Sequence, residues 1–391
     1  MLDGIRVLDL SQNIAGPQAT QILGDLGADV IKVEPPGGDP ARKWGPPFWD
    51  GDAPIFLAFN RNKRSIVVNL KSEQGREVVE RLLAKADVVV QSFRKGVVEG
   101  FGFGFEAVRE RFPRMIYASL TGYGSEGPLA STPGYDPLLQ AYSGIMSLTG
   151  HPDGPPARVG GSVVDIGSGN LLALGILAAL RKRDFEGMGT HIECSLLDTS
   201  LGWIGYHMMG YVASGQAPQR MGTGLALIAP YEAFPTSDGE LMICGGNDPI
   251  FKRLCEGLRI PEIAEDSRFL DNPSRVKHSK ELCDLLSERT RRLTTEGLRG
   301  LLAEYRVPCA PIQDIPQVVK DPQVEANRIF EPEPHPRIPD YTDLKMSVRF
   351  DGERPPLRKF PPAVGEHTGE VLAELGYKES QISRYIGGLP R

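Results

Sequence analysis

The chain has 391 residues, 40% of them hydrophobic, and a formal net charge of −6 at pH 7. This length and composition are enough to bury a sizeable core and to form two domains. The mild negative charge, without a basic stripe, excludes a nucleic-acid partner bound through counterion release. The five cysteines have no CxxC or CxxH spacing, which excludes a structural zinc site and fits a reducing compartment.

Strand and helix patterns alternate through the first third of the chain. Apolar runs predict strands at 5–10, 28–34, 87–91 and 115–119, and helical spacing predicts helices at 17–26 and 73–85. Such alternation is typical of a parallel sheet covered by helices on both faces. We therefore expect an α/β fold with a Rossmann-like large domain.

A Rossmann-like sheet raises the alternative of a nucleotide-binding dehydrogenase. Glu34 ends the second predicted strand, where an acidic residue would hold a ribose. However, the first turn reads SQNIAGPQ and lacks the GxGxxG that lets the backbone approach a pyrophosphate. The sequence therefore disfavours a dehydrogenase.

The segment 134–180 contains GYDPLLQAYSGIMSLTG, a proline-rich turn and then SVVDIGSGNLLALGILAAL. The last run predicts a helix that is apolar on every side and must be buried, because no face is left for water. Asp165 stands at its start, beside free backbone N–H donors that would hold a carboxylate ionised and oriented. Two interpretations stay open from this pattern, an N-cap and a functional carboxylate.

The texture of the sequence changes near residue 231. The segment YEAFPTSDGELMICGG predicts a hairpin around an Asp-Gly turn, followed by helices at 249–258 and 279–302, as in a small α+β domain. A long surface connection at 328–362 carries one predicted strand at 344–350. The last predicted helix, 366–375, ends at Gly376. No secretory segment is evident, and the longest apolar run, 171–180, is too short to cross a bilayer. We expect a cytoplasmic protein with no membrane partner.

A series of motifs runs through nearly the whole chain. They are LDGIRVLDLSQNIAGPQ, VIKVEPPGGDPAR, FNRNKRSIVVNLKSEQG, ADVVVQSFRKGV, YASLTGYGSEGP, PGYDPLLQAYSG, VVDIGSG, VPCAPI and GEHTGEVLAELGY. In this order and at these distances, the chain resembles the family III (CaiB/BaiF-like) CoA-transferases. That group includes formyl-CoA transferase, carnitine CoA-transferase and α-methylacyl-CoA racemase.

The resemblance implies a domain organisation and an assembly. A large CoA-binding domain would begin with 1–200, followed by a linker at 201–228 and a small domain at 229–325. Residues 326–391 would be a second linker and a return to the large domain. Each monomer would form a ring, and two rings would interlock as a homodimer. The active site would then lie between the large domain of one subunit and the small domain of the other.

The resemblance also implies the chemistry. Asp165 would attack a donor acyl-CoA, and an aspartyl anhydride and an aspartyl-CoA thioester would follow, because a carboxylate is an adequate nucleophile toward a thioester. An acyl-CoA and a free carboxylic acid are then the substrates. No metal, nicotinamide, ATP or tightly bound cofactor is expected.

Contacts to the CoA moiety carry over by position. They are Ile14, Ala15, Arg42, Val68, Asn69, Leu70, Lys71, Ser92, Phe93, Arg94, Tyr135 and Asp136. Two arginines of formyl-CoA transferase that hold phosphates are replaced here by Pro35 and Gly100. The adenine end would therefore be held differently, by Arg64 or Lys63.

Tyr135 separates the two enzymatic alternatives. The racemase branch carries a histidine at this position and uses it with the aspartate as an acid/base pair. Tyrosine, with a free pKa of about 10, is a poor base at neutral pH. The residue favours a transferase over a racemase. A CoA-binding protein without turnover is the third alternative.

Substrate identity depends on the middle of the chain. The segment RMGTGLALIAPYEAFPTSDG resembles the subgroup that uses succinyl-CoA with a dicarboxylic acid such as glutarate. Arg158 or Arg220 would bind the distal carboxylate. Gly245 and Gly246 correspond to substrate-pocket residues of the small domain, although a hairpin edge that ends in glycines explains them equally well.

Overall fold

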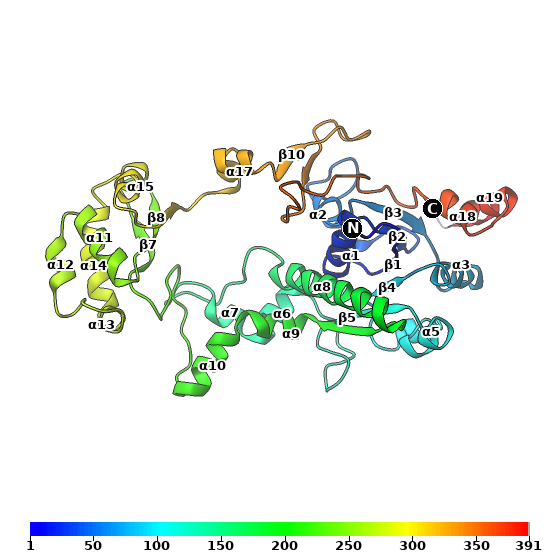
Figure 1. Ribbon diagram of the computed structural model, residues 1–391, viewed down its shortest axis with the longest axis horizontal. Helices are drawn as coiled ribbons and strands as arrows, with labels where there is room; N and C mark the ends of the chain where they lie inside the picture. The colour runs from blue at the N-terminus through cyan, green and yellow to red at the C-terminus, as the bar shows by residue number, and fades with distance from the viewer. Residues whose placement is uncertain (390–391) are drawn as a thin grey trace. The chain divides into compact units, whose positions relative to one another are not determined.

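The computed structural model describes residues 1–389, and Figure 1 shows its elements. The chain divides into two compact units. The first consists of Met1–Ile145, Val159–Met209 and the chain from Val324 onward, and the second of Met146–Arg158 and Gly210–Gln323. The two ends of the chain therefore belong to one unit. Of the predicted C-terminal segment 326–391, residues 390–391 lie outside the described residues.

The prediction that all of 1–200 belongs to the large domain is wrong for one loop. Residues 146–158 cluster with the second unit. Arg220 donates hydrogen bonds to the carbonyl oxygens of His151 (3.3 Å) and Gly154 (2.8 Å), and Gly222 N–H donates to the Gly150 carbonyl (2.9 Å). These non-local bonds tie the loop to the segment near residue 220.

A six-stranded parallel sheet forms the centre of the first unit. In spatial order its strands are β3 (Lys63–Val67), β2 (Asp29–Glu34), β1 (Arg6–Leu10), β4 (Val88–Gln91), β5 (Ile116–Thr121) and β6 (His191–Ser195). This 3-2-1-4-5-6 order is that of the Rossmann fold, with its topological switch point between β1 and β4. The predicted parallel sheet is confirmed, but β3 and β6 were not predicted.

Helices cover both faces of this sheet (Figure 1). One face packs against α1 (Ala15–Asp25) and α8 (Val163–Glu186), and the other against α3 (Glu73–Leu83), α5 (Phe105–Arg111), α18 (Thr368–Glu374) and α19 (Glu379–Gly387). Neighbouring strand residues alternate between the two cores: Val7 and Val30 face the first, and Leu8 and Ile31 the second. The central strand β4 (VVVQ) and most of β5 are apolar on both faces because both faces of the sheet are covered.

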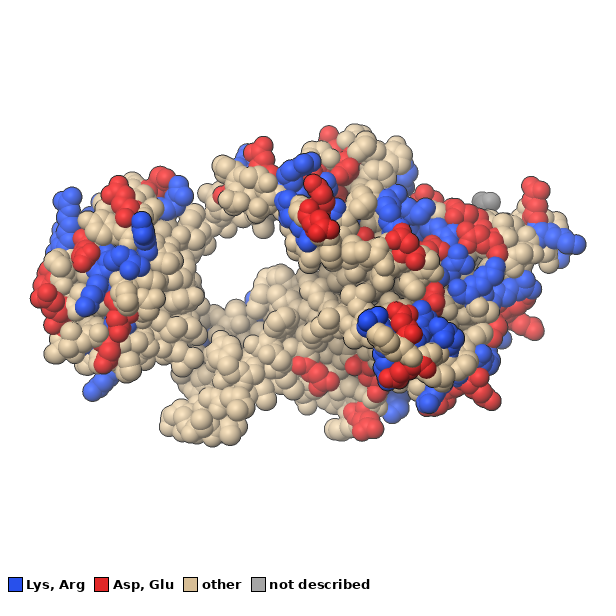
Figure 2. Space-filling model, viewed as in Figure 1, with Lys and Arg blue, Asp and Glu red and all other residues tan. Residues whose placement is uncertain are grey.

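The remaining elements of the first unit and of the junctions are short. They are η1 (Pro40–Lys43), α2 (Pro54–Ala58), α4 (Val97–Gly100), α6 (Asp136–Ser143), α7 (Ile145–Leu148), α9 (Leu196–Trp203), α10 (Gly205–Ser214), α16 (Ile315–Val319), α17 (Pro322–Asn327), and the antiparallel pair β10 (Phe330–Pro332) and β11 (Thr342–Leu344). Helix α10 falls inside the predicted linker 201–228. It contains no Lys, Arg, Asp or Glu, and its region is tan in Figure 2.

Helix α8 differs from its prediction. It was expected to be buried on every side, but Leu174 is 63% exposed and Phe185 is 71% exposed. Its buried side chains pack against α1 and the sheet, so only part of its circumference is covered within one chain. By length and apolar composition it is the one helix within residues 1–389 that could cross a membrane, and half of its most apolar 18 residues are buried inside the chain.

The second unit is a small α+β structure. Its antiparallel sheet has the order β7 (Tyr231–Pro235), β8 (Glu240–Cys244) and β9 (Cys309–Pro311), and its helices are α11 (Asp248–Gly257), α12 (Pro261–Glu265), α13 (Asn272–Lys277), α14 (Ser279–Thr290) and α15 (Thr295–Glu304). The predicted hairpin is confirmed. The prediction of one helix at 279–302 is wrong, because the Thr294 hydroxyl accepts the Gly297 N–H (3.1 Å) and starts a new helix.

Two predictions for the C-terminal segment are also wrong. The strand expected at 344–350 is only β11, which ends at Leu344 after pairing with β10. Lys345 bonds Glu331 (2.5 Å), and the chain turns at Phe350, which pairs with Glu353. Gly376 follows α18 with a φ of 85°, as expected of a helix stop, but α19 follows it, so the predicted last helix is not the last.

Candidate active site

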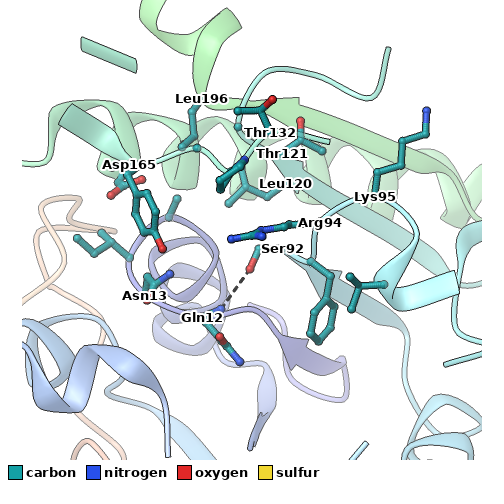
Figure 3. A pocket seen from close by; sticks show the side chains of 18 of the residues that line it. Gln12, Asn13, Ser92, Arg94, Lys95, Leu120, Thr121, Thr132, Asp165 and Leu196 are labelled. Carbon is teal, nitrogen blue, oxygen red and sulfur yellow. Dashed lines mark hydrogen bonds between the residues drawn. The ribbon is translucent and has the colours of Figure 1, made fainter. Parts of the chain in front are cut away.

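A pocket of about 450 Å³ opens at the carboxyl ends of the strands in the first unit (Figure 3). Gln12 and Asn13 follow β1, Ser92 and Arg94 follow β4, and Thr121 ends β5. The Gln12 N–H donates to the Ser92 hydroxyl (3.2 Å), which joins the two loops on either side of the switch point. Open α/β sheets bind their ligands at this place.

Asp165 lines this pocket from the first turn of α8. Burial raises the pKa of its carboxyl to about 7, and the nearby charge of Asp136 adds to the shift. This upward shift is opposite to the one expected if helix-start N–H donors held the Asp165 carboxylate. The N-cap interpretation is also wrong, because Ser162 occupies the N-cap position.

The N–H donors of α8 are bound by a different carboxylate. Asp136 Oδ2 accepts the N–H groups of Val164 (2.8 Å) and Asp165 (3.3 Å), and Oδ1 accepts Gln140 Nε2 (2.6 Å). Gln140 in turn accepts the Val159 N–H (2.9 Å) through Oε1. Asp136 is only 2% exposed and is not among the residues that line the pocket. Its predicted contact with CoA is corrected to a support for the start of α8.

Ten of the twelve predicted CoA-binding residues line two neighbouring pockets. The pocket of Asp165 is lined by Ile14, Ala15, Ser92, Phe93, Arg94 and Tyr135. A second, largely apolar pocket of about 390 Å³ is lined by Val68, Asn69, Leu70 and Lys71, together with Pro35 and Pro36. Gln12, Phe93 and Val97 line both, so the two pockets adjoin. The roles of these residues toward CoA stay predictions.

Arg94 is exposed and reaches across the first pocket, whereas the neighbouring Lys95 points away from Asp165 (Figure 3). Lys95 Nζ donates to the Ser125 carbonyl (2.9 Å). No described residue forms a hydrogen bond or an ion pair with the Arg94 guanidinium. Arg94 is thus the cation best placed to meet an anionic group in this pocket.

Arg42, in contrast, was predicted to contact CoA and does not lie at either pocket. Its guanidinium is 4% exposed and donates to Glu34 (2.7 and 2.8 Å), to Asp52 (3.0 Å) and to the Pro362 carbonyl (2.9 Å). The predicted contact of Arg42 with CoA is therefore wrong, because Glu34, Asp52 and the Pro362 carbonyl already accept its N–H groups. The ribose role considered for Glu34 fails for the same reason, since Glu34 is buried against Arg42 and the Ser65 hydroxyl (2.5 Å).

Lys63 and Arg64 do not hold the adenine end either. Lys63 is fully buried and bonds Asp9 (3.2 Å), Asn60 (2.9 Å) and the Pro17 carbonyl (2.9 Å). Arg64 pairs with the carboxylates of Asp29, Glu370 and Glu374. Both predictions are wrong because β3 places these side chains among acidic partners inside the unit.

The predicted acid-binding residues belong to the second unit. Gly245 N–H donates to the Pro230 carbonyl (3.0 Å), and the Gly246 carbonyl accepts Arg275 Nη2 (2.8 Å). Arg220 bonds the carbonyls of its own unit, as described above, and Arg158 lies in the loop 146–158. Their roles toward a carboxylic acid stay predictions.

The sequence pattern of the CoA-transferase family III matches residues 2–368. The chain belongs to CoA-transferase family III. This assignment confirms the family predicted from the motifs, and with it an enzyme that transfers CoA.

Several relatives of this family III CoA-transferase have named activities. The chain is 42% identical to the succinate–glutarate CoA-transferase of Agrobacterium fabrum, covering 96% of this chain and 95% of that protein. It is 37% identical to the human succinyl-CoA:glutarate CoA-transferase, covering 98% and 88%. It is 41% identical to the acetyl-CoA:oxalate CoA-transferase of Acetobacter aceti, covering 84% and 85%.

A solved structure has the same fold as this CoA-transferase. A CaiB/BaiF family protein from Brucella suis superposes with a TM-score of 0.85 at 41% identity, covering 96% of this chain and 99% of that one. The likeness extends through both units of the chain.

Sequence reasoning missed some pocket residues of this transferase. Gln12, Asn13, Trp44, Lys95 and Thr132 also line the pocket of Asp165. The positions of Gln12 and Asn13 directly after the first strand carry a usable signal, because ligand-binding loops follow the strands at a switch point. Trp44 and Thr132 lie in irregular segments, and no local pattern marks them.

Proposed function

We propose that this enzyme transfers CoA from succinyl-CoA to a dicarboxylic acid of the glutarate class. The observation that carries the proposal is the position of Asp165 in a pocket that also holds six of the predicted CoA-binding residues. The substrate class rests on the names of relatives that share 37–42% of their residues with nearly the whole chain.

The proposed reaction uses Asp165 as the nucleophile. Its carboxylate attacks the thioester carbonyl of succinyl-CoA, which forms an aspartyl–succinyl anhydride and releases the CoA thiolate. The thiolate attacks the Asp165 carbonyl, so an aspartyl-CoA thioester forms and succinate leaves. The acceptor carboxylate attacks this thioester, and the released thiolate then attacks the acceptor acyl carbon. The products are a new acyl-CoA and the regenerated Asp165 carboxylate.

The raised pKa of Asp165 suits this role. A carboxylate with a pKa of about 7 is more basic, and so more nucleophilic, than an exposed one, while a sizeable fraction is still ionised at neutral pH. Burial of Asp165 also limits access of water to the anhydride and the thioester, which hydrolyse readily.

The two adjoining pockets give the CoA moiety a site in the first unit. The thioester end lies beside Asp165, and Arg94 offers a cation to the phosphates. The adenosine end occupies the second pocket, where Pro35, Leu70 and Phe101 supply apolar surface and Lys71 a charge. The adenine end is then held in this pocket and not by Lys63 or Arg64, which bond acidic partners inside the unit.

The racemase alternative finds no support in the pocket. A racemase needs a second acid/base group across the α-carbon from the aspartate. No histidine is among the residues within 1–389 that line the pocket of Asp165, and Tyr135 stands where the racemase branch has one. Exchange of the α-proton for deuterium from D₂O is therefore not expected.

We also propose that the enzyme is a homodimer, as its resemblance to the family implies. Apolar side chains that a second copy would cover lie on α6 and α8: Tyr142 is 60% exposed, Leu174 63% and Leu171 49%. Sedimentation equilibrium should give twice the chain mass of 42.7 kDa. A mass of one chain at micromolar concentration would contradict the dimer.

Mass spectrometry of the exchange reaction tests the proposed function. The protein is incubated with succinyl-CoA and a pool of mono- and dicarboxylic acids, and new acyl-CoA masses are sought. We expect a dicarboxylyl-CoA to form together with an equal amount of succinate, because the thioester energy is conserved. Release of free CoA without a new acyl-CoA would instead indicate a hydrolase and overturn the proposal.

A further inference from the structure

A fully buried arginine lies behind the glycine pair of the second unit. Arg275, on α13, is 0% exposed and donates four hydrogen bonds. Its acceptors are the carbonyl oxygens of Ala229 (2.8 Å), Phe269 (3.1 Å) and Gly246 (2.8 Å), and the carboxylate of Asp248 (2.7 Å). One side chain therefore joins three separate segments of the chain.

The Gly245–Gly246 turn is held between this arginine and the segment 228–230. Gly245 N–H donates to the Pro230 carbonyl (3.0 Å). A Cβ atom added at Gly246 would lie 1.8 Å from Ile228 Cγ2, and one added at Gly245 would lie 2.9 Å from Leu254 Cδ2. Only glycine allows this approach of the backbone, so the turn has little freedom while Arg275 is in place.

The guanidinium is well suited to this task and an ammonium is not. Its planar fork directs N–H donors to four acceptors at once, and the ring of Phe251 lies 4.7 Å from its central carbon. Within residues 1–389, Asp248 is the carboxylate that pairs with it. Such a buried charge is tolerated only when its donors are satisfied, so the surrounding carbonyls must keep their positions.

We propose that Arg275 is a positioning residue, which holds the Gly245–Gly246 turn in the conformation that receives the carboxylic acid substrate. The inference rests on the proposed function and on the predicted contact between these glycines and the acid. Arg275 itself does not touch substrate. Its effect should therefore be confined to the acid, because the predicted CoA-binding residues belong to the first unit.

The first test is Arg275→Lys, which keeps the charge and loses most of the bonds. We expect the KM for the acceptor acid to rise about tenfold, with the KM for succinyl-CoA changed less than twofold. Asp248→Asn is a milder variant at a half-exposed position, 52% exposed, which removes only the ion pair and should give a smaller shift in the same direction. It keeps the test usable if Arg275→Lys fails to fold.

Arg253→Lys is the matched control. Arg253, on α11, also donates to backbone carbonyls, those of Tyr305 (3.0 Å) and Arg306 (3.3 Å), but it does not bond the glycine turn. The Arg253→Lys variant should lower the melting temperature without changing the KM for the acid. If Arg275→Lys does the same, the positioning role is overturned.

Gly246→Ala separates this inference from the proposed function. If it raises the KM for the acid while Arg275→Lys does not, the glycines bind the acid and Arg275 has no part in it. If neither variant changes that KM although exchange activity is normal, the proposed contact of the glycines is itself wrong. A rise in the KM for the acid in both variants, with no change of that KM in Arg253→Lys, supports the inference.

Discussion

Replacement of Asp165 by asparagine is expected to abolish CoA exchange, with a loss of about 10⁴-fold or more in kcat/KM. Asparagine has nearly the same shape as aspartate. Its neutral amide is not a carboxylate nucleophile, so it cannot form the anhydride. The pocket and its predicted CoA-binding residues would stay intact, so binding of succinyl-CoA should persist. Exchange measured by mass spectrometry and binding measured by calorimetry check the two statements separately.

Asp165→Glu serves as the matched control for this variant. It keeps the carboxylate but moves it by one methylene, and a displacement of about 1 Å costs on the order of 10²-fold in rate. Activity should therefore follow the order aspartate, glutamate, asparagine. Exchange at the normal rate in Asp165→Asn would mean that another group is the nucleophile and would remove the proposed mechanism.

The Asp165→Asn variant should be more stable than the natural protein at alkaline pH. Burial raises the pKa of Asp165 in the folded state from 3.8 to about 7, so the folded chain holds a proton that the unfolded chain has lost. Stability conferred by this proton is complete below pH 4 and is lost as the pH rises toward 7. Asparagine does not ionise. The gain in unfolding free energy for Asp165→Asn should therefore grow by about 2–3 kcal/mol between pH 5 and pH 8 in urea titrations.

The elements predicted correctly are those whose signal is local. Strands β1, β2, β4 and β5 are short runs of apolar residues, and hairpin β7–β8 surrounds an Asp-Gly turn. Strand β3 was missed because it begins with Lys63 and Arg64, which a sequence pattern assigns to the surface. Those charges are buried because Asp9 on β1 pairs with Lys63, and Asp29 on the adjacent strand β2 pairs with Arg64.

Non-local partners also explain the errors at the site. The sequence predicts that Arg42 contacts CoA, but Glu34 and Asp52 pair with it in the fold. Asp165 was expected to be ionised by the helix start, but Asp136, from a helix that precedes α8, takes those N–H groups. The motif order was enough to gather most of the pocket, whereas the protonation of its central residue depends on a contact that no spacing shows.

Asp136→Asn is expected to shift the pH dependence of catalysis to lower pH. Removal of the Asp136 charge takes away one of the two causes that raise the pKa of Asp165 and leaves burial, the larger one, in place. In the natural enzyme kcat/KM should rise with pH and level off above pH 8, because the attacking carboxylate is half ionised near pH 7. In the variant the rising limb should begin at lower pH, and the plateau should lie roughly tenfold lower, since a less basic carboxylate is a weaker nucleophile.

A helix cap in the second unit provides the control for the structural part of this change. Asp136→Asn also replaces a carboxylate that binds the N–H groups of Val164 and Asp165, and loss of a cap costs about 1 kcal/mol of stability. Thr294→Ala removes the cap of α15 at a similar cost, and Thr294 belongs to the second unit, whereas the described residues that line the pocket of Asp165 belong to the first. Only Asp136→Asn should move the pH profile, because only it changes the charge that Asp165 meets. If the rising limb of the kcat/KM profile stays near pH 7 in both variants, Asp165 owes its raised pKa to burial alone. Asp136 then serves only to fix the start of α8.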